Sequence, residues 1–414
     1  MIFVYNLLLN ILSPVLVFWA WLRAKKRDEQ PNWAERFGHY DIKPGNKNRI
    51  WFHAVSVGEV MAALPVLRQL RERLPGIEIV LTTTTSSGHK TAREKAAGLY
   101  DHLFYFPIDF GRCMFRAVSR VRPGMVVVME TELWLNFFHF SKQMGAKVVV
   151  INGRISRNYN LSLKLKAYYR AIFDRVDRIF AQSDLDKERL IALGAHDVQV
   201  LGNTKFDQAV EAMTAHHFDW RHLMGIPDSA VCIVVGSTRS EAEEHLVMNG
   251  LTKVPDAWVI YAPRHIERAP HVGDLAREHG FEPSFRTDEV HGKFLILDTY
   301  GELASAYSSA DIAIIGGAFD ELGGQNILQP MAAAVPVLHG PHMFNFKEAA
   351  ALASQLGATR TVSTAEELGE ALQELCNNPD LRTKMGAAGK EMIEQSLGAS
   401  GRYADVISRM MTPV

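Results

Sequence analysis

The chain has 414 residues, of which 47% are hydrophobic and 22% charged, and this composition is typical of a folded globular protein and excludes extensive disorder. Its length predicts two domains. The 45 basic and 46 acidic residues nearly balance, which argues against a nucleic-acid-binding protein. The three cysteines have neither disulfide nor metal-ligand spacing, so we expect a reduced chain without a zinc or iron site.

The N-terminal residues 2–22 are almost wholly apolar and are followed directly by the basic segment 23–27. This length is close to the roughly 20 residues that cross a bilayer, and the basic flank favours the cytoplasmic side. Asn6, Asn10 and Pro14 weaken the case for a straight span, so a helix in the membrane interface is the alternative. Either way, we expect residues 1–27 to be a membrane anchor with its basic flank.

From residue 28 to residue 207, apolar segments of strand length alternate with helical patterns. This alternation predicts an α/β domain with a parallel sheet, in which helices fill the intervals between strands. We expect its strands at residues 49–53, 77–82, 103–106, 125–129, 147–151, 177–182 and 198–201.

In WFHAVSVGEV, residues 51–60, an apolar strand is followed by a turn of small residues and the start of a helix. Glu59 therefore lies in the first helical turn, at the carboxyl end of a strand. One interpretation is that Glu59 only complements the helix dipole. The other is that Glu59 is a general base, because ligands bind at the carboxyl ends of parallel strands.

Charged residues also follow three later strands of this domain. Glu130 and Glu132 follow the fourth expected strand, Arg154 and Arg157 follow the fifth, and Lys205 follows the last. Paired carboxylates are also common at a solvated helix start, and isolated arginines are usually surface charges. At a crevice, however, arginine forks suit phosphate or carboxylate ligands.

The polar residues 208–229 are interpreted as an interdomain linker, after which the alternation of strand and helix starts again. Residues 230–395 are predicted to form a second α/β domain, and residues 396–414 a helix that packs back toward the first domain. We expect the strands of the second domain at residues 231–235, 257–261, 293–297, 312–316, 335–338 and 358–362.

The second domain carries the features of a ligand-binding domain. Pro263 and Arg264 follow one strand, and the loop GGAFDELGGQN follows another and opens a helix near Asn326. Glycines allow close approach of the backbone to a ligand, and free N–H groups at a helix start bind anions. The loop is neither a Walker loop nor a GxGxxG motif. Paired with Arg264, it favours a phosphate-bearing nucleotide. Its glycines are Gly316, Gly317, Gly323 and Gly324.

Together, the segments HAVSVGEV, METELW, NGRISR, GNTKFD, GSTRSEAEE, PRH, DTYGEL and GGAFDELGGQN resemble the lipid A Kdo transferases, which add 3-deoxy-D-manno-octulosonic acid (Kdo) to a lipid A precursor. The resemblance runs from the N-terminal segment almost to residue 400. It implies a GT-B fold, in which two doubly wound Rossmann-like domains face a central cleft. It further implies CMP-Kdo as the donor, inversion at the anomeric carbon, and no metal or other cofactor.

The resemblance also implies roles for individual residues. Glu59 would be the general base that deprotonates the acceptor hydroxyl, and Glu130 and Lys205 would stabilise the transition state. Ser56, Gly58, Arg154 and Arg157 are the candidates for the acceptor site. The glycine loop would complete a donor site whose implied nucleotide contacts are Pro263, Arg264, Tyr300, Gly301, Glu302, Asn326, Ile327, Leu328 and Gln329.

On this resemblance the chain is a membrane-associated enzyme of lipopolysaccharide inner-core synthesis, at the cytoplasmic face of the inner membrane and without an obligate protein partner. The chain departs from the family at Gln325, where many members have histidine, and at Gln329, where many have glutamate. Three alternatives stay open: a nucleotide-sugar 2-epimerase, a membrane-associated nucleotide-sugar binder that transfers nothing, and a transferase that moves another nucleotide-linked sugar to another lipid.

Overall fold

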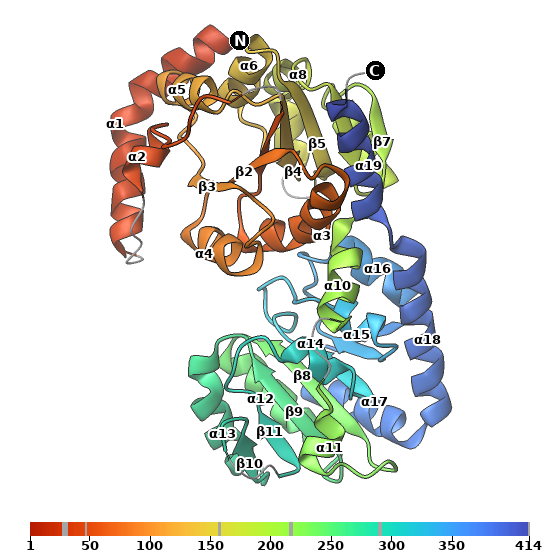
Figure 1. Cartoon of the computed structure of the whole chain (residues 1–414). Helices are drawn as coiled ribbons and strands as arrows, with labels where there is room; N and C mark the ends of the chain where they lie inside the picture. The colour runs from red at the N-terminus through yellow and green to blue at the C-terminus, as the bar shows by residue number, and fades with distance from the viewer. Residues whose placement is uncertain (27–31, 46–47, 156–158, 215–217, 289–291, 413–414) are drawn as a thin grey trace. The chain divides into compact units, whose positions relative to one another are not determined.

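The computed structural model describes every residue except 27–31, 46–47, 156–158, 215–217, 289–291 and 413–414. The chain folds as two compact units. Unit 1 consists of Met1–Gln208 and Gly398–Val414, and unit 2 is Ala209–Leu397. Each unit is built on a seven-stranded parallel sheet with helices between the strands (Figure 1), which confirms the expected α/β class.

The sheet of unit 1 has the strand order β3-β2-β1-β4-β5-β6-β7. The chain builds outward from β1 in one direction and then from β4 in the other, so a topological switch point lies between these two neighbours. The strands are β1 (Arg49–His53), β2 (Glu78–Thr83), β3 (His102–Tyr105), β4 (Met125–Met129), β5 (Lys147–Gly153), β6 (Arg178–Ala181) and β7 (Val198–Val200).

Helices cover both faces of this sheet. Its described helices are α1 (Ile2–Lys26), α2 (Trp33–Arg36), α3 (Val57–Arg73), α4 (Ser86–Lys95), α5 (Gly111–Val121), α6 (Leu135–Gln143), α7 (Tyr159–Lys164), α8 (Lys166–Phe173), α9 (Asp184–Ala192), the start of α10 (Thr204–Thr214) and α19 (Ala399–Met411). Trp51 of β1 belongs to the core cluster that includes residues of α5, α6, α8 and α9, whereas Ile50 and Phe52 belong to the cluster that includes residues of α3, α4 and α19. Burial on both faces makes the strands continuous apolar runs. This is why the predicted strand ends lie within two residues of those observed.

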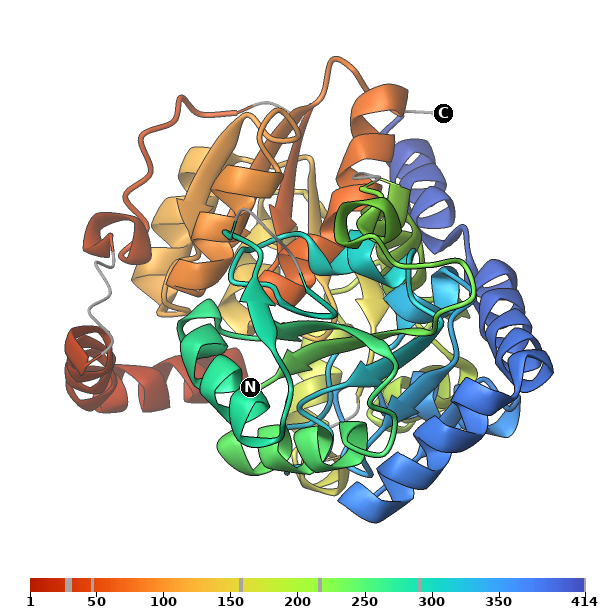
Figure 2. The ribbon, with the colours of Figure 1, turned by 90° about the horizontal axis from the view of Figure 1, so that it is seen from below.

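The last helix, α19, belongs to unit 1 and lies beside α3 in both views (Figures 1 and 2). Tyr403 is buried, and its hydroxyl donates to the Gly202 carbonyl oxygen at 2.6 Å. The Asp207 carboxylate accepts the backbone N–H groups of Gly398 at 2.6 Å and Ser400 at 2.7 Å. One carboxylate thus fixes the start of α19 beside the point where the chain leaves unit 1.

Helix α1 is attached to unit 1 through polar side chains of its first turns. The Tyr5 hydroxyl donates to Asp109 Oδ2 at 2.8 Å, and the amides of Asn6 and Asn136 exchange two hydrogen bonds of 2.9 and 2.8 Å. Asp109 is buried, which raises the pKa of its carboxyl group to about 7. Asn6, which interrupts the apolar stretch in the sequence, therefore has a structural role.

Several apolar side chains of α1 are nevertheless exposed, among them Phe3 (76%), Ile11 (66%) and Val15 (66%). Within the described part of the chain, no helix has the combination of length and apolarity needed to cross a bilayer. The expected membrane-spanning anchor is therefore not supported. Polar residues interrupt this apolar stretch: the Asn6 side chain pairs with Asn136 of unit 1, and the Ser13 hydroxyl donates to the Asn10 backbone carbonyl at 2.8 Å.

The sheet of unit 2 has the order β10-β11-β9-β8-β12-β13-β14, with its switch point between β8 and β12. Helices α12 (Glu241–Leu251), α13 (Ala269–Glu278) and α17 (Ala365–Asn377) pack on one face of this sheet. The strands are β8 (Cys232–Thr238), β9 (Trp258–Pro263), β10 (Pro283–Phe285), β11 (Phe294–Ile296), β12 (Ile312–Ile315), β13 (Val337–His339) and β14 (Thr359–Thr361). The described helices are α11 (Trp220–Met224), α12 (Glu241–Leu251), η1 (Ile266–Arg268), α13 (Ala269–Glu278), α14 (Leu303–Tyr307), α15 (Leu328–Ala332), α16 (Lys347–Gln355), α17 (Ala365–Asn377) and α18 (Pro379–Ser396).

Two features of unit 2 differ from the sequence expectation. Residues 208–229, interpreted as a linker, include most of α10 and the whole of α11. Trp220 of this segment is fully buried, and its indole N–H donates to the Ser305 hydroxyl at 3.0 Å. The second difference is β10, a three-residue strand at the sheet edge that begins with Pro283.

Candidate active site

The carboxyl ends of the strands of sheet 1 carry four of the predicted site residues. Glu59 follows β1 in the first turn of α3, and Glu130 follows the neighbouring strand β4. Arg154 follows β5, and Lys205 lies in the first turn of α10. The two glutamates therefore flank the switch point, where ligands bind in open α/β sheets.

The Glu59 side chain closes the hydrogen-bonded start of its own helix. The Val55 N–H donates to Oε2 at 2.8 Å, and the Ser56 hydroxyl donates to Oε1 at 3.2 Å. Glu59 is only 8% exposed. These contacts show that Glu59 stabilises the start of its own helix, as the first interpretation expects. They do not exclude base chemistry, because each carboxylate oxygen has two lone-pair sites and these bonds use one on each.

The surroundings of Glu59 raise its pKa to about 8. Burial is the main cause, the charges of Glu130 and Glu132 add to it, and the bonds from Val55 and Ser56 oppose it. Burial and the charge of Glu130 also raise the pKa of Glu132. A carboxyl group with a pKa in this range is suited to accept and release a proton near neutral pH.

Glu130 holds the two cations of the site. Arg154 Nε lies 3.1 Å from its Oε2, and Lys205 Nζ lies 3.8 Å from its Oε1. Burial lowers the pKa of Lys205, while the charges of Glu130 and Glu59 oppose that shift. The backbone of Glu130 has φ = 55°, which is uncommon for a residue other than glycine and often marks a functional site. The structure therefore brings Glu59, Glu130, Arg154 and Lys205 into one charged cluster.

Two asparagines position the start of α10 and hence Lys205. Asn152 Oδ1 accepts the Thr204 N–H at 3.2 Å, and Asn203 Oδ1 accepts the Lys205 N–H at 3.0 Å. Asn152 is fully buried, and its backbone, like that of Glu130, is left-handed. Sequence reasoning did not single out Asn152, although it opens the NGR segment at the end of β5.

Of the three other acceptor-site candidates in unit 1, the structure describes two. Ser56 contacts Glu59, as described above. Gly58 is exposed, and a Cβ at this position would meet no atom within 4 Å, so packing does not require glycine there. Arg157 lies outside the described residues.

In unit 2 the glycine loop follows β12 at the switch point of the second sheet. Gly317, Gly323 and Gly324 have positive φ angles of 68°, 94° and 72°. A Cβ on Gly316 would lie 2.5 Å from Thr238 Cα, and the Gly324 N–H donates back to the Gly317 carbonyl at 2.6 Å. The shape of the loop itself therefore requires glycine at these positions.

Two N–H groups of this loop are already occupied by a carboxylate of the chain. Glu243 Oε1 accepts the N–H groups of Ala318 at 3.2 Å and Phe319 at 3.4 Å, and its Oε2 accepts the Arg239 N–H at 2.9 Å. Glu243 is 1% exposed. Glu243 therefore occupies the N–H groups of Ala318 and Phe319, so donor phosphates would need other groups. The anion site that the sequence predicts lies at the other end of the loop, at the helix start near Asn326, and stays a prediction.

Glu243 was not singled out in the sequence, although a signal for it was present. The segment GSTRSEAEE repeats the strand, small turn and acidic helix of HAVSVGEV. In each segment a serine starts the helix and a glutamate lies three residues later, the pattern of a capping box. These pairs are Ser56 with Glu59 and Ser240 with Glu243.

Arg264 follows Pro263 at the end of β9 and exposes its side chain. Its N–H donates to the Thr238 carbonyl at 2.9 Å. Among the described residues, the Arg264 guanidinium has no salt bridge, unlike Arg154 of unit 1. Its side chain is therefore available to an anionic ligand.

The segment from Tyr300 to Glu302 presents one free ring and one fixed carboxylate. The Tyr300 side chain is 66% exposed and precedes Gly301, whose φ is 93°. The Glu302 carboxylate accepts Arg286 Nε at 3.1 Å and also the Thr299 hydroxyl. An exposed aromatic ring beside a rigid turn can stack on a nucleobase.

The residues from Asn326 to Gln329 differ in their availability to a ligand. Asn326 Oδ1 accepts the Leu328 N–H at 2.9 Å. Ile327 and Leu328 are 0% and 1% exposed, so only their backbones are able to contact a nucleotide. Gln329 is half-buried in α15. Across the described residues of both units, no group of three His, Cys, Asp or Glu side chains is placed to hold a metal ion.

Comparisons with known proteins find relatives over most of the chain. A family model described as 3-deoxy-D-manno-octulosonic-acid transferase (kdotransferase) matches residues 31–208. The 3-deoxy-D-manno-octulosonic acid transferase of Haemophilus influenzae is 32% identical to the chain, over 98% of the chain and 97% of the relative.

Two solved structures share the fold. The UDP-GlcNAc 2-epimerase of Neisseria meningitidis, bound to UDP-GlcNAc, has a TM-score of 0.59 and 14% identity, and the match covers 88% of this chain and 99% of the epimerase. MurG of Acinetobacter baumannii has a TM-score of 0.58 and 13% identity, over 87% of this chain and 99% of MurG. At these identities, both structures bear on the fold alone.

Proposed function

Because the chain belongs to the family of 3-deoxy-D-manno-octulosonic acid transferases, and is thus a glycosyltransferase with a GT-B-like fold, we propose that it transfers Kdo from CMP-Kdo to a hydroxyl group of a lipid A precursor. The transfer inverts the anomeric carbon and needs no metal ion. The observation that carries this mechanism is the position of Glu59, with its raised pKa, in the cluster with Glu130 and Lys205 at the switch point of sheet 1.

In the proposed reaction, the acceptor hydroxyl oxygen attacks the anomeric carbon of Kdo and loses its proton to the Glu59 carboxylate. The bond between the anomeric carbon and the phosphate oxygen breaks, and CMP leaves as the anion. Glu130 and Lys205 stabilise the charges that develop in the transition state, since fixed charges in a shielded site cost little reorganisation. Glu130 also holds Lys205 and Arg154 in place.

Unit 2 binds the donor in this proposal. Arg264, whose guanidinium is exposed, pairs with the phosphate of CMP, because the guanidinium fork matches phosphate oxygens. Tyr300 and the turn at Gly301 contact the nucleoside, and Asn326 and Gln329 border the ribose. An amide at Gln329 accepts a hydrogen bond from a ribose hydroxyl through its carbonyl oxygen, as a carboxylate would.

We further propose that the protein acts at the cytoplasmic face of the inner membrane, with α1 lying in the interface rather than spanning the bilayer. The support is the exposed apolar surface of α1 together with its attachment to unit 1 through Tyr5 and Asn6. Interfacial helices insert their apolar face at the boundary between headgroups and acyl chains.

Transfer of radiolabelled Kdo from CMP-Kdo to a tetraacylated lipid A precursor tests the activity. We expect a product that carries Kdo and the release of one CMP for each bond formed. Conversion of UDP-GlcNAc without transfer would instead identify an epimerase, and binding of CMP-Kdo without a product would identify a binding protein. Either result would refute the proposed function.

A further inference from the structure

Helix α5 carries a row of arginines between hollows of unit 1. Arg112, Arg116 and Arg120 are four residues apart, so their side chains lie on one face of the helix. A hollow of about 630 Å³ lies between α1, α2 and α5 and has a mostly apolar wall. A second hollow, of about 670 Å³, is lined by the three arginines and by His39 and Phe115. Arg112 belongs to both.

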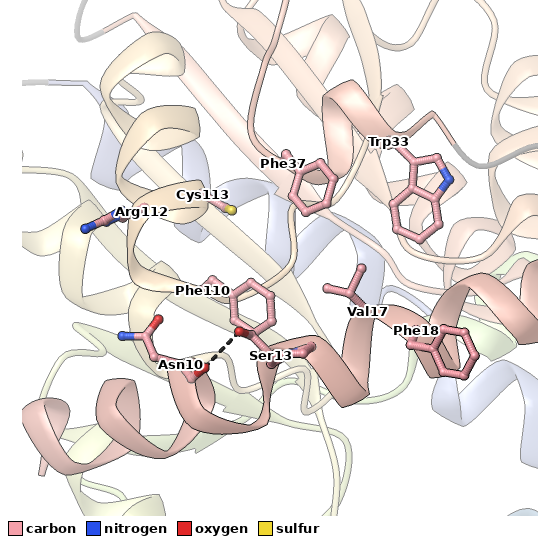
Figure 3. A pocket seen from close by; sticks show the side chains of 10 residues that line it. Asn10, Ser13, Val17, Phe18, Trp33, Phe37, Phe110, Arg112 and Cys113 are labelled. Carbon is pink, nitrogen blue, oxygen red and sulfur yellow. Dashed lines mark hydrogen bonds between the residues drawn. The ribbon is translucent and has the colours of Figure 1, made fainter.

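The apolar hollow lies between α1 and the rest of unit 1 (Figure 3). Phe37 and Phe110 contribute aromatic rings from unit 1, and Val17 and Phe18 line it from α1. The Arg112 side chain lies at the edge of this hollow, with its guanidinium directed away from the rings. The apolar hollow thus borders the arginine-lined hollow at Arg112. The volume of each hollow is within the range of ligand pockets.

The charged side chains that line these hollows are cationic. Arg112 and Arg120 are exposed and form no salt bridge within the described residues. Arg116 is fixed differently, since its Nη1 donates to the Phe37 carbonyl at 2.8 Å and lies 2.7 Å from His39 Nε2. None of the described residues that line the two hollows is acidic. The second hollow is therefore suited to an anion.

Several large apolar side chains of α1 and α5 are exposed to solvent. Ile11, Val15 and Phe18 of α1 are 66%, 66% and 59% exposed, and Phe115 of α5 is 50% exposed. Contiguous exposed apolar side chains rimmed by polar ones mark an interaction surface. Apolar residues bordered by arginines are typical of surfaces that lie on anionic membranes.

From this juxtaposition we infer that α1 and α5 form a binding site for an anionic phospholipid of the bilayer. An acyl chain lies in the apolar hollow, and the lipid phosphate pairs with the row of Arg112, Arg116 and Arg120. Guanidinium groups match phosphate oxygens in charge and in hydrogen-bond geometry. The inference rests on the proposed interfacial position of α1, but not on the transfer chemistry of the cluster around Glu59.

Binding of the full-length protein to vesicles of phosphatidylglycerol and to vesicles of phosphatidylcholine tests this inference. We expect the wild-type chain to prefer phosphatidylglycerol. The double variant Arg112→Gln/Arg120→Gln, which breaks no described hydrogen bond, should bind phosphatidylglycerol roughly 30-fold more weakly, since each arginine near an anionic surface contributes about 1 kcal/mol. Phe18→Ser should weaken binding to both lipids roughly tenfold or more, because it removes an apolar contact.

A matched control removes the same charge elsewhere. Lys384 and Lys390 are exposed on α18 of unit 2, and Lys384→Gln/Lys390→Gln should keep wild-type binding. If the arginine variant binds phosphatidylglycerol as the wild type does, the lipid site is refuted and the membrane attachment stands. If the wild type binds neither vesicle, both are refuted.

The acceptor lipid is the competing occupant. With donor and acceptor in detergent, the arginine variant should have wild-type kcat and wild-type KM for the lipid A precursor. A raised acceptor KM in that variant would assign the hollows to the acceptor and overturn the inference.

Discussion

Glu59 and Glu243 make the same contact in the two units. Each accepts the backbone N–H of the residue four positions earlier, Val55 at 2.8 Å and Arg239 at 2.9 Å. Their surroundings differ, because Glu243 accepts two further N–H groups of the glycine loop, whereas Glu59 faces the charges of Glu130 and Glu132. The shared contact explains the repeated sequence pattern. The different surroundings give Glu243 a structural role in the glycine loop and leave Glu59 as the proposed base.

The first prediction compares these two carboxylates. Glu59→Gln keeps the size of the side chain but removes the proposed base, so kcat should fall by about 10²- to 10⁴-fold. Glu243→Gln should instead lower stability and raise the KM for the donor while kcat is largely kept, because it disturbs the N–H groups of Ala318 and Phe319. Steady-state kinetics of both variants distinguish the roles. A wild-type kcat for Glu59→Gln would remove Glu59 from the mechanism.

The second prediction concerns the pH dependence of transfer. The base must be ionised, so kcat/KM should rise with pH and level off above about 8, the pKa of Glu59. The charge of Glu132 contributes to that raised pKa. Glu132→Gln should therefore move the midpoint of the profile to lower pH. A profile that stays in place in this variant would show that Glu59 does not control it.

The third prediction concerns the cation beside Glu130. Lys205→Met should lower kcat by about 10²- to 10³-fold, because a fixed charge in the proposed transition-state site is lost. Lys142→Met is the matched control, since Lys142 Nζ lies 2.7 Å from Asp177 at the amino end of β6, away from the site. Both variants lose a partly buried ion pair, and urea unfolding measures that loss separately from kcat. Equal kcat values in the two variants would contradict the role of Lys205.

The fourth prediction concerns Asp109, the buried acceptor of the Tyr5 hydroxyl. Its pKa is raised from 3.8 to about 7, so the folded state keeps its proton at a pH where the unfolded state has lost it. This group therefore favours folding most at low pH, and its contribution to the free energy of unfolding falls as pH rises from about 4 to 7.

Asp109→Asn should lower stability, because the amide has one fewer acceptor oxygen for Tyr5 and for the backbone N–H groups of Asn136 and Phe137. It should also flatten the fall in stability with pH. Urea unfolding at pH 5 and at pH 8, for the wild type and the variant, measures both effects. An unchanged slope in the variant would mean that Asp109 is ionised throughout.

Much of the sheet architecture was predictable because the strands are buried on both faces. Ile50, Trp51 and Phe52 form a continuous apolar run, and short runs of this kind between turn residues are typical of strands buried on both faces. The strand β10 escaped prediction because it is short, lies at an edge and begins with Pro283. The helix α11 escaped because the burial of Trp220 depends on Ser305, which is far away in sequence.

The site was predictable in its residues but not in its contacts. Sequence pattern places Glu59 at a strand end and, through its spacing from Ser56, at a helix start. Only the fold shows that Arg154 and Lys205 both lie beside Glu130. Glu243 shows the same limit, because its partner Ala318 is 75 residues away. Contacts of this kind are fixed by tertiary structure, and a local pattern contains no information about them.

The return of α19 to unit 1 determines when that unit is able to finish folding. On the ribosome, residues 1–208 emerge first, but the sheet face that packs against Tyr403 stays uncovered until α19 is made. Unit 2, a continuous segment, is complete before then. Unit 1 therefore finishes folding after unit 2. A fragment that stops at Gln208 lacks α19, so it would expose apolar surface and be prone to aggregation.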